Sequence, residues 1–245
     1  MPEHEIWLTR LFNDHLAGLG NTILNTFGVH ASHPDRPWAN FITMELLVAA
    51  IIVVLFLMLR TRLSVDKPSH TQQAFEVIYE FLRGESQDQV GHDAHKYLAY
   101  FATIFIFILF SNLIGIIPGF ESPTMAPSVP AGCALATFVY YNLMGIRANG
   151  VLQYLKHFAG PMLWLAPFML PIELISHLAR PLSLTIRLFA NMFAGEKVTV
   201  VFLSLTYFLI PAVFMGLHVF VAILQAYIFV LLTMMYVAGA VAHDH

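Results

Sequence analysis

The sequence predicts an all-α integral membrane protein with about five membrane helices and one amphipathic helix on the membrane surface. Hydrophobic residues make up 58% of its 245 residues and charged residues only 11%. The mean hydropathy is +0.70. Such values are typical of multi-spanning membrane proteins. Several apolar runs also approach the roughly 20 residues that a helix needs to cross a bilayer. We expect residues 1–245 to form one integral membrane domain.

The amino-terminal part of the chain is expected to lie outside the membrane. Residues 1–41 are too polar for the apolar region of a signal peptide, and no small-residue cleavage site follows the first apolar run. The first predicted span is residues 42–59, with Trp38 at its outer interface and Arg60 and Arg62 at its other end.

Residues 71–83 predict a helix that lies on the membrane surface. They are too short and too charged to span a bilayer. At helical spacing their apolar side chains form one face, with the charged side chains opposite. The apolar face holds Phe75, Ile78, Phe81 and Leu82, and the polar face holds Glu76, Glu80 and Arg83.

Two further spans are predicted at residues 97–117 and 127–146, and together they form a helical hairpin over residues 97–146. Pro118 and Gly119 end the first of these spans. Both spans are apolar, although the second is less uniform.

The apolar stretch at residues 161–241 predicts a long hairpin, divided near Ser204–Tyr207 and Pro211. As one helix, residues 163–209 would be roughly 70 Å long, more than twice the hydrocarbon thickness of about 30 Å. This arm must therefore be broken, steeply tilted or partly at the surface. Pro167, Pro171 and Pro181 are possible kinks.

The distribution of Lys and Arg predicts the orientation of the chain. With the amino terminus outside, seven basic residues fall in inside loops and two outside, so the carboxyl end is cytoplasmic. The outside turns are then expected near residues 119–130 and 206–211. The inside set is Arg60, Arg62, Lys67, Arg83, Lys96, Arg147 and Lys156, and the outside set is Arg10 and Arg36.

Arg187 lies in a segment that otherwise reads as membrane-buried. A guanidinium at mid-bilayer costs roughly 3 to 17 kcal/mol, which makes it a functional candidate. The alternative is an arginine near a helix end that reaches the headgroups. Glu173 and Arg180 precede Arg187 at intervals of seven residues, so the three side chains lie near one helical face.

Other polar residues repeat this arrangement. Asn191 follows Arg187 by one turn, and His218 and Gln225 are seven residues apart on the last helix. Single Asn, Gln or His side chains in membrane helices often only link neighbouring helices, at about 0.6 kcal/mol each. A whole face of carboxylate, guanidinium, amide and imidazole groups is instead what a proton or ion path requires.

Residue numbering predicts which of these groups share a height. Across an antiparallel hairpin, residues at one height have numbers with a constant sum. The residue numbers of Arg187 and Gln225 and those of Glu196 and His218 have nearly equal sums. Each pair is therefore expected to face each other across the hairpin, as one rung, and the two rungs are expected to lie about 13 Å apart. The turn is expected near residues 206–207.

Three runs of this sequence resemble subunit a of F-type ATP synthases, and the resemblance covers residues 40–241 in order and spacing. The first run is Arg180-Pro-Leu-Ser-Leu-Thr-Ile-Arg187-Leu-Phe-Ala-Asn191-Met-Phe-Ala-Gly-Glu196. The second is Leu224-Gln225-Ala-Tyr-Ile-Phe. The third is Ser111-Asn112-Leu-Ile-Gly-Ile-Ile-Pro118.

The resemblance implies roles for individual residues. Arg187 matches the arginine that faces the carboxylates of the rotating c-ring, and Gln225 matches the glutamine near it. Asn191, Glu196 and His218 match the half-channel open to the outside. Glu173, with Ser176 and His177 nearby, matches the half-channel open to the cytoplasm, and Asn112 matches a polar position on the second span.

One position departs from the family pattern. Some bacterial members carry an aspartate where this chain has Gly115, three residues after Asn112. The outer half-channel then draws either on Glu121 or on His218 and Glu196 alone.

The resemblance also implies the setting of the protein. We expect a non-catalytic stator subunit that needs no cofactor and couples proton flow to ring rotation and ATP synthesis. Its expected partners are the c-ring, peripheral stalk subunit b, other ATP synthase subunits and membrane lipids. The absence of a transit peptide favours the inner membrane of a bacterial cell, although organelle-encoded members of the family also lack one. The distribution of Lys and Arg places the amino terminus outside and the carboxyl terminus in the cytoplasm.

Two other classes of function would also place polar residues in this chain. A stand-alone ion channel or secondary transporter would explain the charges within the membrane. A zinc enzyme would use His92, Asp93 and His95 or the terminal His243-Asp244-His245, although no HExxH motif is present. The net charge of −3 gives no reason to expect nucleic acid.

Overall fold

A computed structural model describes residues 5–26, 28, 33–64, 67–91, 93–117, 119–151, 154, 166–205 and 209–242. This part of the chain contains seven α-helices, two short 3₁₀ helices and no strand, which confirms the all-α prediction. The helices are α1 (Trp7–Thr26), α2 (Asn40–Thr61), α3 (His70–Val90), α4 (Leu98–Ile114), α5 (Ser128–Asn149), α7 (Ala166–Leu205) and α8 (Leu209–Val241). The 3₁₀ helices are η1 (Ala94–Lys96) and η2 (Pro123–Met125).

Three of these helices are long and apolar enough to cross a membrane. They are α2, α5 and the Ala212–Val241 part of α8. The 17-residue α4 is also apolar but shorter, because the chain leaves the helix at Gly115 rather than at residue 117. The protein is therefore a multi-pass membrane protein, as the sequence predicts.

The amino-terminal segment contains a helix, α1, that the sequence analysis did not predict. It packs on the start of α2, where the Thr9 and Thr43 hydroxyls are 2.7 Å apart. The Trp38 indole Nε1–H donates to the carbonyl of Leu16 at 2.9 Å. A Cβ on Gly20 would lie only 2.9 Å from the Trp38 ring, so this position of α1 has room only for glycine.

The predicted surface helix is longer than expected: α3 runs from residue 70 to residue 90 rather than from 71 to 83. Ser69 caps its start, because its hydroxyl accepts a hydrogen bond from the backbone N–H of Gln72 at 3.2 Å. Gly91, with a φ of 84°, ends it. Leu82 is fully buried, and the ring of Phe81 lies 5.5 Å from that of Tyr227 on α8.

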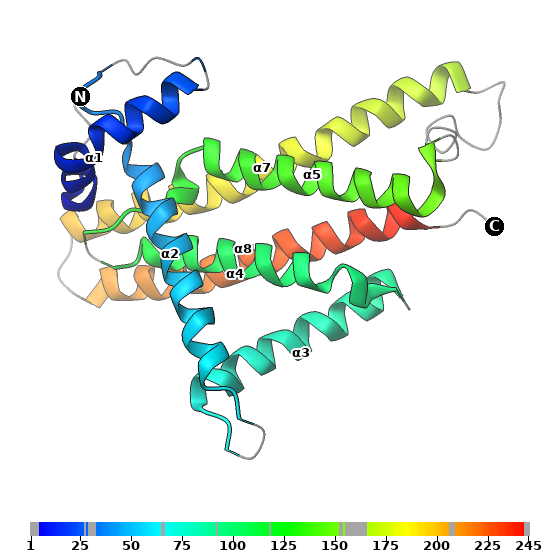
Figure 1. The fold of residues 1–245 in the computed structure, drawn as a ribbon, viewed down its shortest axis with the longest axis horizontal. Helices are drawn as coiled ribbons and strands as arrows, with labels where there is room; N and C mark the ends of the chain where they lie inside the picture. Colours follow the sequence, from blue (N-terminus) through cyan, green and yellow to red (C-terminus); the bar gives the residue numbers. More distant parts are fainter. Residues whose placement is uncertain are drawn as a thin grey trace.

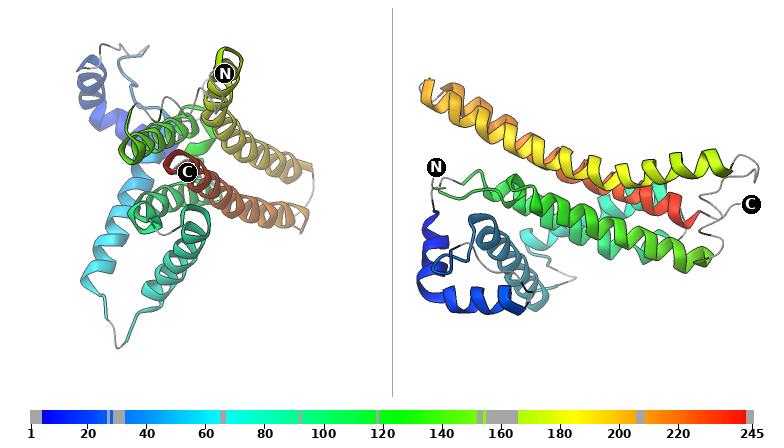
Figure 2. Two further views of the ribbon diagram at one scale, coloured as in Figure 1. Left: turned by 90° about the vertical axis from the view of Figure 1, so that its right-hand side faces the viewer. Right: turned by 90° about the horizontal axis from the view of Figure 1, so that it is seen from above.

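Figures 1 and 2 show α4, α5, α7 and α8 running alongside one another, with α2 crossing their direction. Fully buried apolar side chains fill the space between these helices. They include Phe101 and Ile108 on α4, Tyr141 on α5, Leu184, Leu188 and Met192 on α7, and Phe229 and Met234 on α8.

Helix α7 is continuous over 40 residues, with Pro171 and Pro181 inside it. It is therefore not broken at either proline, and its length is about 60 Å. The 22 residues of α2 span about 33 Å, which matches the hydrocarbon core. Helix α2 crosses the direction of α7 and α8 (Figure 1), so these helices cannot all stand along one membrane normal.

The ends of α7 and α8 agree with the predicted position of the turn between them. Helix α7 ends at Leu205 and α8 begins at Leu209, on either side of the expected turn at residues 206–207, which itself lies outside the described residues. Near the tip, the Phe202 and Phe214 rings stack with centroids 4.1 Å apart.

Candidate ion-translocation site

The centre of the hairpin is a polar pair between α7 and α8. The Asn191 Nδ2 donates to Gln225 Oε1 at 2.6 Å. Gln225 is only 1% exposed, and its Nε2 has no hydrogen-bond partner among the described residues. The predicted rung paired Gln225 with Arg187, so the observed partner is the polar residue one turn further along α7.

Arg187 is half-buried at the edge of the contact between α7 and α8. One side of its helix carries the buried Leu184 and Leu188. The adjoining face carries three exposed small residues at helical spacing, Ser183, Ala190 and Ala194. In the described part of the chain, the guanidinium makes no hydrogen bond or ion pair.

Toward the tip of the hairpin, His218 packs against Gly195. A Cβ at position 195 would lie 3.2 Å from the imidazole Cδ2 and 3.3 Å from Nε2. His218 is 7% exposed, and its Nε2 has no hydrogen-bond partner in the part of the chain that the structure describes. Glu196 follows Gly195 and is half-buried. The structure therefore brings Glu196 and His218 to the same level of the hairpin, as the predicted rung requires.

Asn112 lies beside this region and links α4 to two other elements. Its Nδ2 donates to the carbonyl of Ala222 on α8 at 3.1 Å, and its Oδ1 accepts from the Thr124 hydroxyl of η2 at 2.8 Å. The Ser122 hydroxyl donates to the carbonyl of Ser111 at 2.8 Å. All four side chains are buried, so they fix the loop between α4 and α5 against α8.

The loop also explains why position 115 carries no acidic side chain. A Cβ on Gly115 would lie 2.8 Å from both the Cβ and the backbone nitrogen of Ser122. No side chain fits there unless the backbone moves.

Toward the other end of α7, His177 lies in a network with α5. Its Nε2 is 2.9 Å from Asn142 Oδ1 and 3.3 Å from the Tyr141 hydroxyl. Asn142 Nδ2 donates to the carbonyl of Phe138 at 2.6 Å, which fixes the orientation of the amide. In the tautomer with a proton on Nε2, His177 donates to Asn142 Oδ1, which can only accept.

Tyr154 joins the same network. Its hydroxyl donates to Asn142 Oδ1 at 2.7 Å. Burial raises the pKa of the Tyr154 phenol, and the Arg180 charge partly opposes this, so the hydroxyl keeps its proton at neutral pH.

Glu173 and Arg180 form an ion pair beside this network, with Nη2 and Oε1 3.8 Å apart. The Arg180 guanidinium also lies 5.4 Å from the centre of the Tyr236 ring on α8. The predicted common face of Glu173 and Arg180 is thus confirmed. Ser176 is exposed on α7.

Four of the residues gathered at this end were not among the predicted site residues. They are Tyr141, Asn142, Tyr154 and Tyr236. The one available signal was an amide and three phenols in or next to apolar runs, which does not by itself say which helix they face.

The two polar clusters lie on opposite sides of Arg187 along α7. Glu196 follows Arg187 by nine residues and His177 precedes it by ten, which corresponds to about 13 and 15 Å. Buried apolar side chains lie at the intervening levels, namely Leu184, Leu188 and Met192 on α7 and Ala222, Ala226 and Phe229 on α8.

The zinc alternative receives no support from the described residues, which contain no group of three side chains able to hold a metal. Asp93 instead pairs with Lys96 at 2.8 Å. His92 and the terminal residues 243–245 lie outside the described part of the chain.

Fold and site together define a multi-pass membrane protein. Its helical bundle holds titratable side chains in two separate clusters, one on either side of an arginine that has no ion-pair partner among the described residues. The family described as ATP synthase A chain matches residues 42–238. The chain belongs to this family.

Individual relatives agree with this assignment. ATP synthase subunit a of Solibacter usitatus (strain Ellin6076) is 67% identical over 235 residues, which is 96% of this chain and 100% of the relative. That of Koribacter versatilis (strain Ellin345) is 47% identical over 245 residues and the full length of both chains. That of Sulfurihydrogenibium sp. (strain YO3AOP1) is 43% identical over 82% of this chain and 97% of the relative.

Proposed function

We propose that this chain is the proton-translocating stator subunit of the membrane sector of an F-type ATP synthase. One observation carries the proposal. Arg187 is partly exposed, has no acidic partner in the described part of the chain, and lies between two polar clusters. A charge held at this depth of a membrane is costly unless a partner compensates it.

The compensating partner in this proposal is the carboxylate carried by each subunit of a rotating c-ring. The small side chains Ser183, Ala190 and Ala194 next to Arg187 let a neighbouring helix approach closely. A carboxyl group that arrives beside a fixed guanidinium is favoured in its ionised form and releases its proton. A protonated site cannot pass Arg187 without this release, so the charge also prevents a direct leak.

The two clusters then serve as two half-channels that do not meet. Glu196 and His218, with Asn191 and Asn112 nearby, form the path to the outside. Glu173 and His177 form the path to the cytoplasm, together with Tyr141, Asn142 and Tyr154. Carboxyl and imidazole groups accept and release protons, while hydroxyl and amide groups can hold water between them.

The membrane potential supplies the direction of this cycle. It contributes about 2.3 kcal/mol per elementary charge per 100 mV, which biases the ring toward one sense of rotation. The chain itself would be non-catalytic, and ATP formation would belong to other subunits. Peripheral stalk subunit b would hold it against rotation, with lipids around its other faces.

We place the protein in the bacterial inner membrane with its amino terminus outside. The positive-inside distribution of basic residues supports this orientation. Figure 1 shows α1, the start of α5 and the tip of the α7–α8 hairpin at one end of the molecule. This arrangement agrees with outside turns near residues 119–130 and 206–211.

Passive proton flux distinguishes this function from that of a stand-alone channel or transporter. The purified chain is placed in vesicles alone, and the whole complex in others, and a potential is imposed. The proposal predicts little flux with the chain alone and coupled flux with the complex. Rapid flux through the chain alone, with no ring of small subunits retained when the chain is purified gently, would favour the rival class.

A further inference from the structure

A second acidic side chain, Glu121, lies near the outer cluster and is held by a residue far from it in sequence. Asn40, the first residue of α2, donates from its Nδ2 to Glu121 Oε2 at 3.3 Å. Its Oδ1 accepts from the backbone N–H of Ile6 at 3.3 Å. One amide therefore connects the amino-terminal segment, α2 and the loop between α4 and α5.

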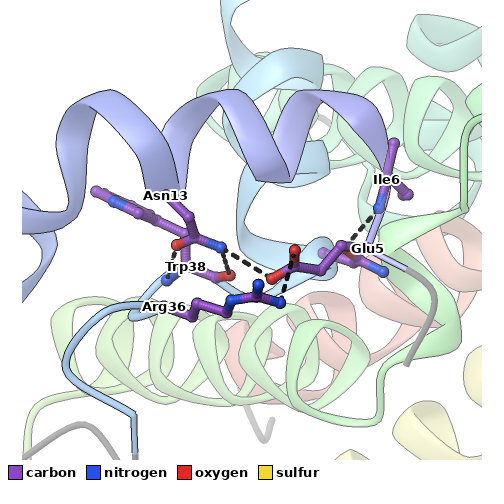
Figure 3. A network of polar contacts seen from close by, with 6 residues as sticks. Glu5, Ile6, Asn13, Arg36 and Trp38 are labelled. Carbon is purple, nitrogen blue, oxygen red and sulfur yellow. Dashed lines mark hydrogen bonds and ion pairs between the residues drawn. The ribbon is translucent and has the colours of Figure 1, made fainter. Parts of the chain in front are cut away.

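Asn40 is itself held in place by the contacts between α1 and the start of α2. Figure 3 shows Asn13 between Trp38 and Glu5. Asn13 donates to the Trp38 carbonyl at 3.2 Å and accepts from the Trp38 backbone N–H at 3.0 Å. Arg36 and Glu5 form an ion pair at 3.1 Å. These contacts fix the backbone that leads into Asn40.

The loop that carries Glu121 is fixed on both sides of this residue. Phe120 makes an edge-on ring contact with Trp7 of α1, with centroids 6.3 Å apart. Ser122 is buried, bonded to the Ser111 carbonyl and pressed against Gly115. Glu121 is thus confined at a defined place while its side chain stays partly exposed.

The loop that carries Glu121 leads into η2, which packs against α7, the helix that carries Glu196. The two acidic residues therefore lie in one region of the protein, where their carboxyl groups act on each other electrostatically. Within the described residues, Glu121 forms no ion pair that would neutralise it. The nearby cation of α7, Lys197, has its Nζ over the ring of Phe193 at 5.3 Å. Two carboxyl groups near one another, one of them partly open to solvent, can pass a proton directly or through a water.

We propose that Glu121 is the outermost proton-accepting residue of the outer path and that Asn40 is the positioning residue that holds its carboxylate toward Glu196. The inference rests on the proposed function. It also follows from the packing at Gly115, because the close contact with Ser122 leaves no room for an acid on α4, whereas Glu121 brings one from the neighbouring loop.

The test uses the whole ATP synthase complex in membrane vesicles and measures ATP synthesis driven by an imposed proton gradient. Glu121→Gln should lower the rate about tenfold, less than the roughly hundredfold typical for loss of a positioned acid, because water and His218 still offer a route. Glu121→Asp should restore part of the rate. Asn40→Ala should lower it to a similar extent.

The double variant separates positioning from a merely structural role. If Asn40 acts through Glu121, Asn40→Ala should cause no further loss in a Glu121→Gln background, because the group that it positions is already gone. Additive losses would show that Asn40 acts by another route and would overturn its assignment.

Asn21→Ala is the matched control. It removes another amide hydrogen bond of α1, from Asn21 Nδ2 to the Pro34 carbonyl at 2.7 Å, without touching Asn40 or Glu121. Its rate should stay normal. An unchanged rate in Glu121→Gln would overturn the inference even if Asn40→Ala failed to assemble. The proposed function would survive that result, because its own test is the loss of synthesis in Arg187→Ala.

Discussion

Asn191 on α7 donates a 2.6 Å hydrogen bond to the buried Oε1 of Gln225 on α8, one helical turn from Arg187. This bond fixes the register of the hairpin at the level where the charged group must be held. It also leaves the Gln225 Nε2 buried without a partner. A buried donor in this state is available to a water molecule or to a group on another subunit.

The Asn191–Gln225 hydrogen bond predicts that a variant lacking one partner is less stable than a variant lacking both. Asn191→Leu removes the donor and leaves two buried polar groups of Gln225 unpaired, which costs about 1 to 3 kcal/mol. Adding Gln225→Leu removes the unpaired groups, so the double variant should be more stable than the single one. Thermal unfolding of the purified complex measures this order. Equal stability of both variants would count against the bond.

Gly115 predicts a packing defect when any side chain is added. Gly115→Ala should destabilise the contact with Ser122 by about 1 to 3 kcal/mol, because the obstacle includes backbone. Gly115→Asp should do so at least as strongly. The amount of assembled complex in the membrane is the measurement. Gly132→Ala is the control, because a Cβ at position 132 meets nothing within 4 Å; similar losses in both would exclude a local clash.

Glu196 and His218 are expected to carry protons in from the outside. Glu196→Gln and His218→Ala should each slow ATP synthesis without uncoupling it, because the arginine that prevents leakage is still present. The measurement compares synthesis with passive proton leak in the same vesicles. Unchanged rates in both variants would move the outer path to other residues.

His177 and Asn142 are expected to serve the opposite path. His177→Phe keeps a ring beside Phe138 and Tyr141, whose centroids lie 5.1 and 5.3 Å from the imidazole, but removes the hydrogen bond to Asn142. Its packing should survive while proton release to the cytoplasm slows several-fold, a smaller loss than for a catalytic acid or base. Wild-type synthesis rates with normal assembly would exclude His177 from the path.

The sequence predicts the spans and the hairpin register because both follow from local periodicity. Apolar runs of the required length mark α2, α4, α5 and α8. The predicted pairs were Arg187 with Gln225 and Glu196 with His218. The structure instead bonds Gln225 to Asn191, one turn along α7, and places Gly195, the neighbour of Glu196, against His218. The height of each residue in the hairpin can be predicted from the rise per residue of a helix and the position of the turn alone.

Two features were not predicted, and each depends on tertiary contacts. The residues of α1 are too polar to mark a span, and the helix is held by bonds to residues 34–43. The network around His177 takes Asn142 and Tyr141 from α5, and no pattern within α5 indicates which side faces α7. Pro171 and Pro181 are also accommodated within α7 without ending it, although the sequence makes them possible breaks.

The most direct test of the central claim is ATP synthesis in membrane vesicles that carry Arg187→Ala. Arg187→Lys is measured beside it, because a lysine can lose its charge when buried. Arg10→Ala serves as a control, since Arg10 is an exposed cation on α1. We predict that both Arg187 variants assemble and synthesise no ATP, while Arg10→Ala works normally. Near-normal synthesis in Arg187→Ala would contradict the account.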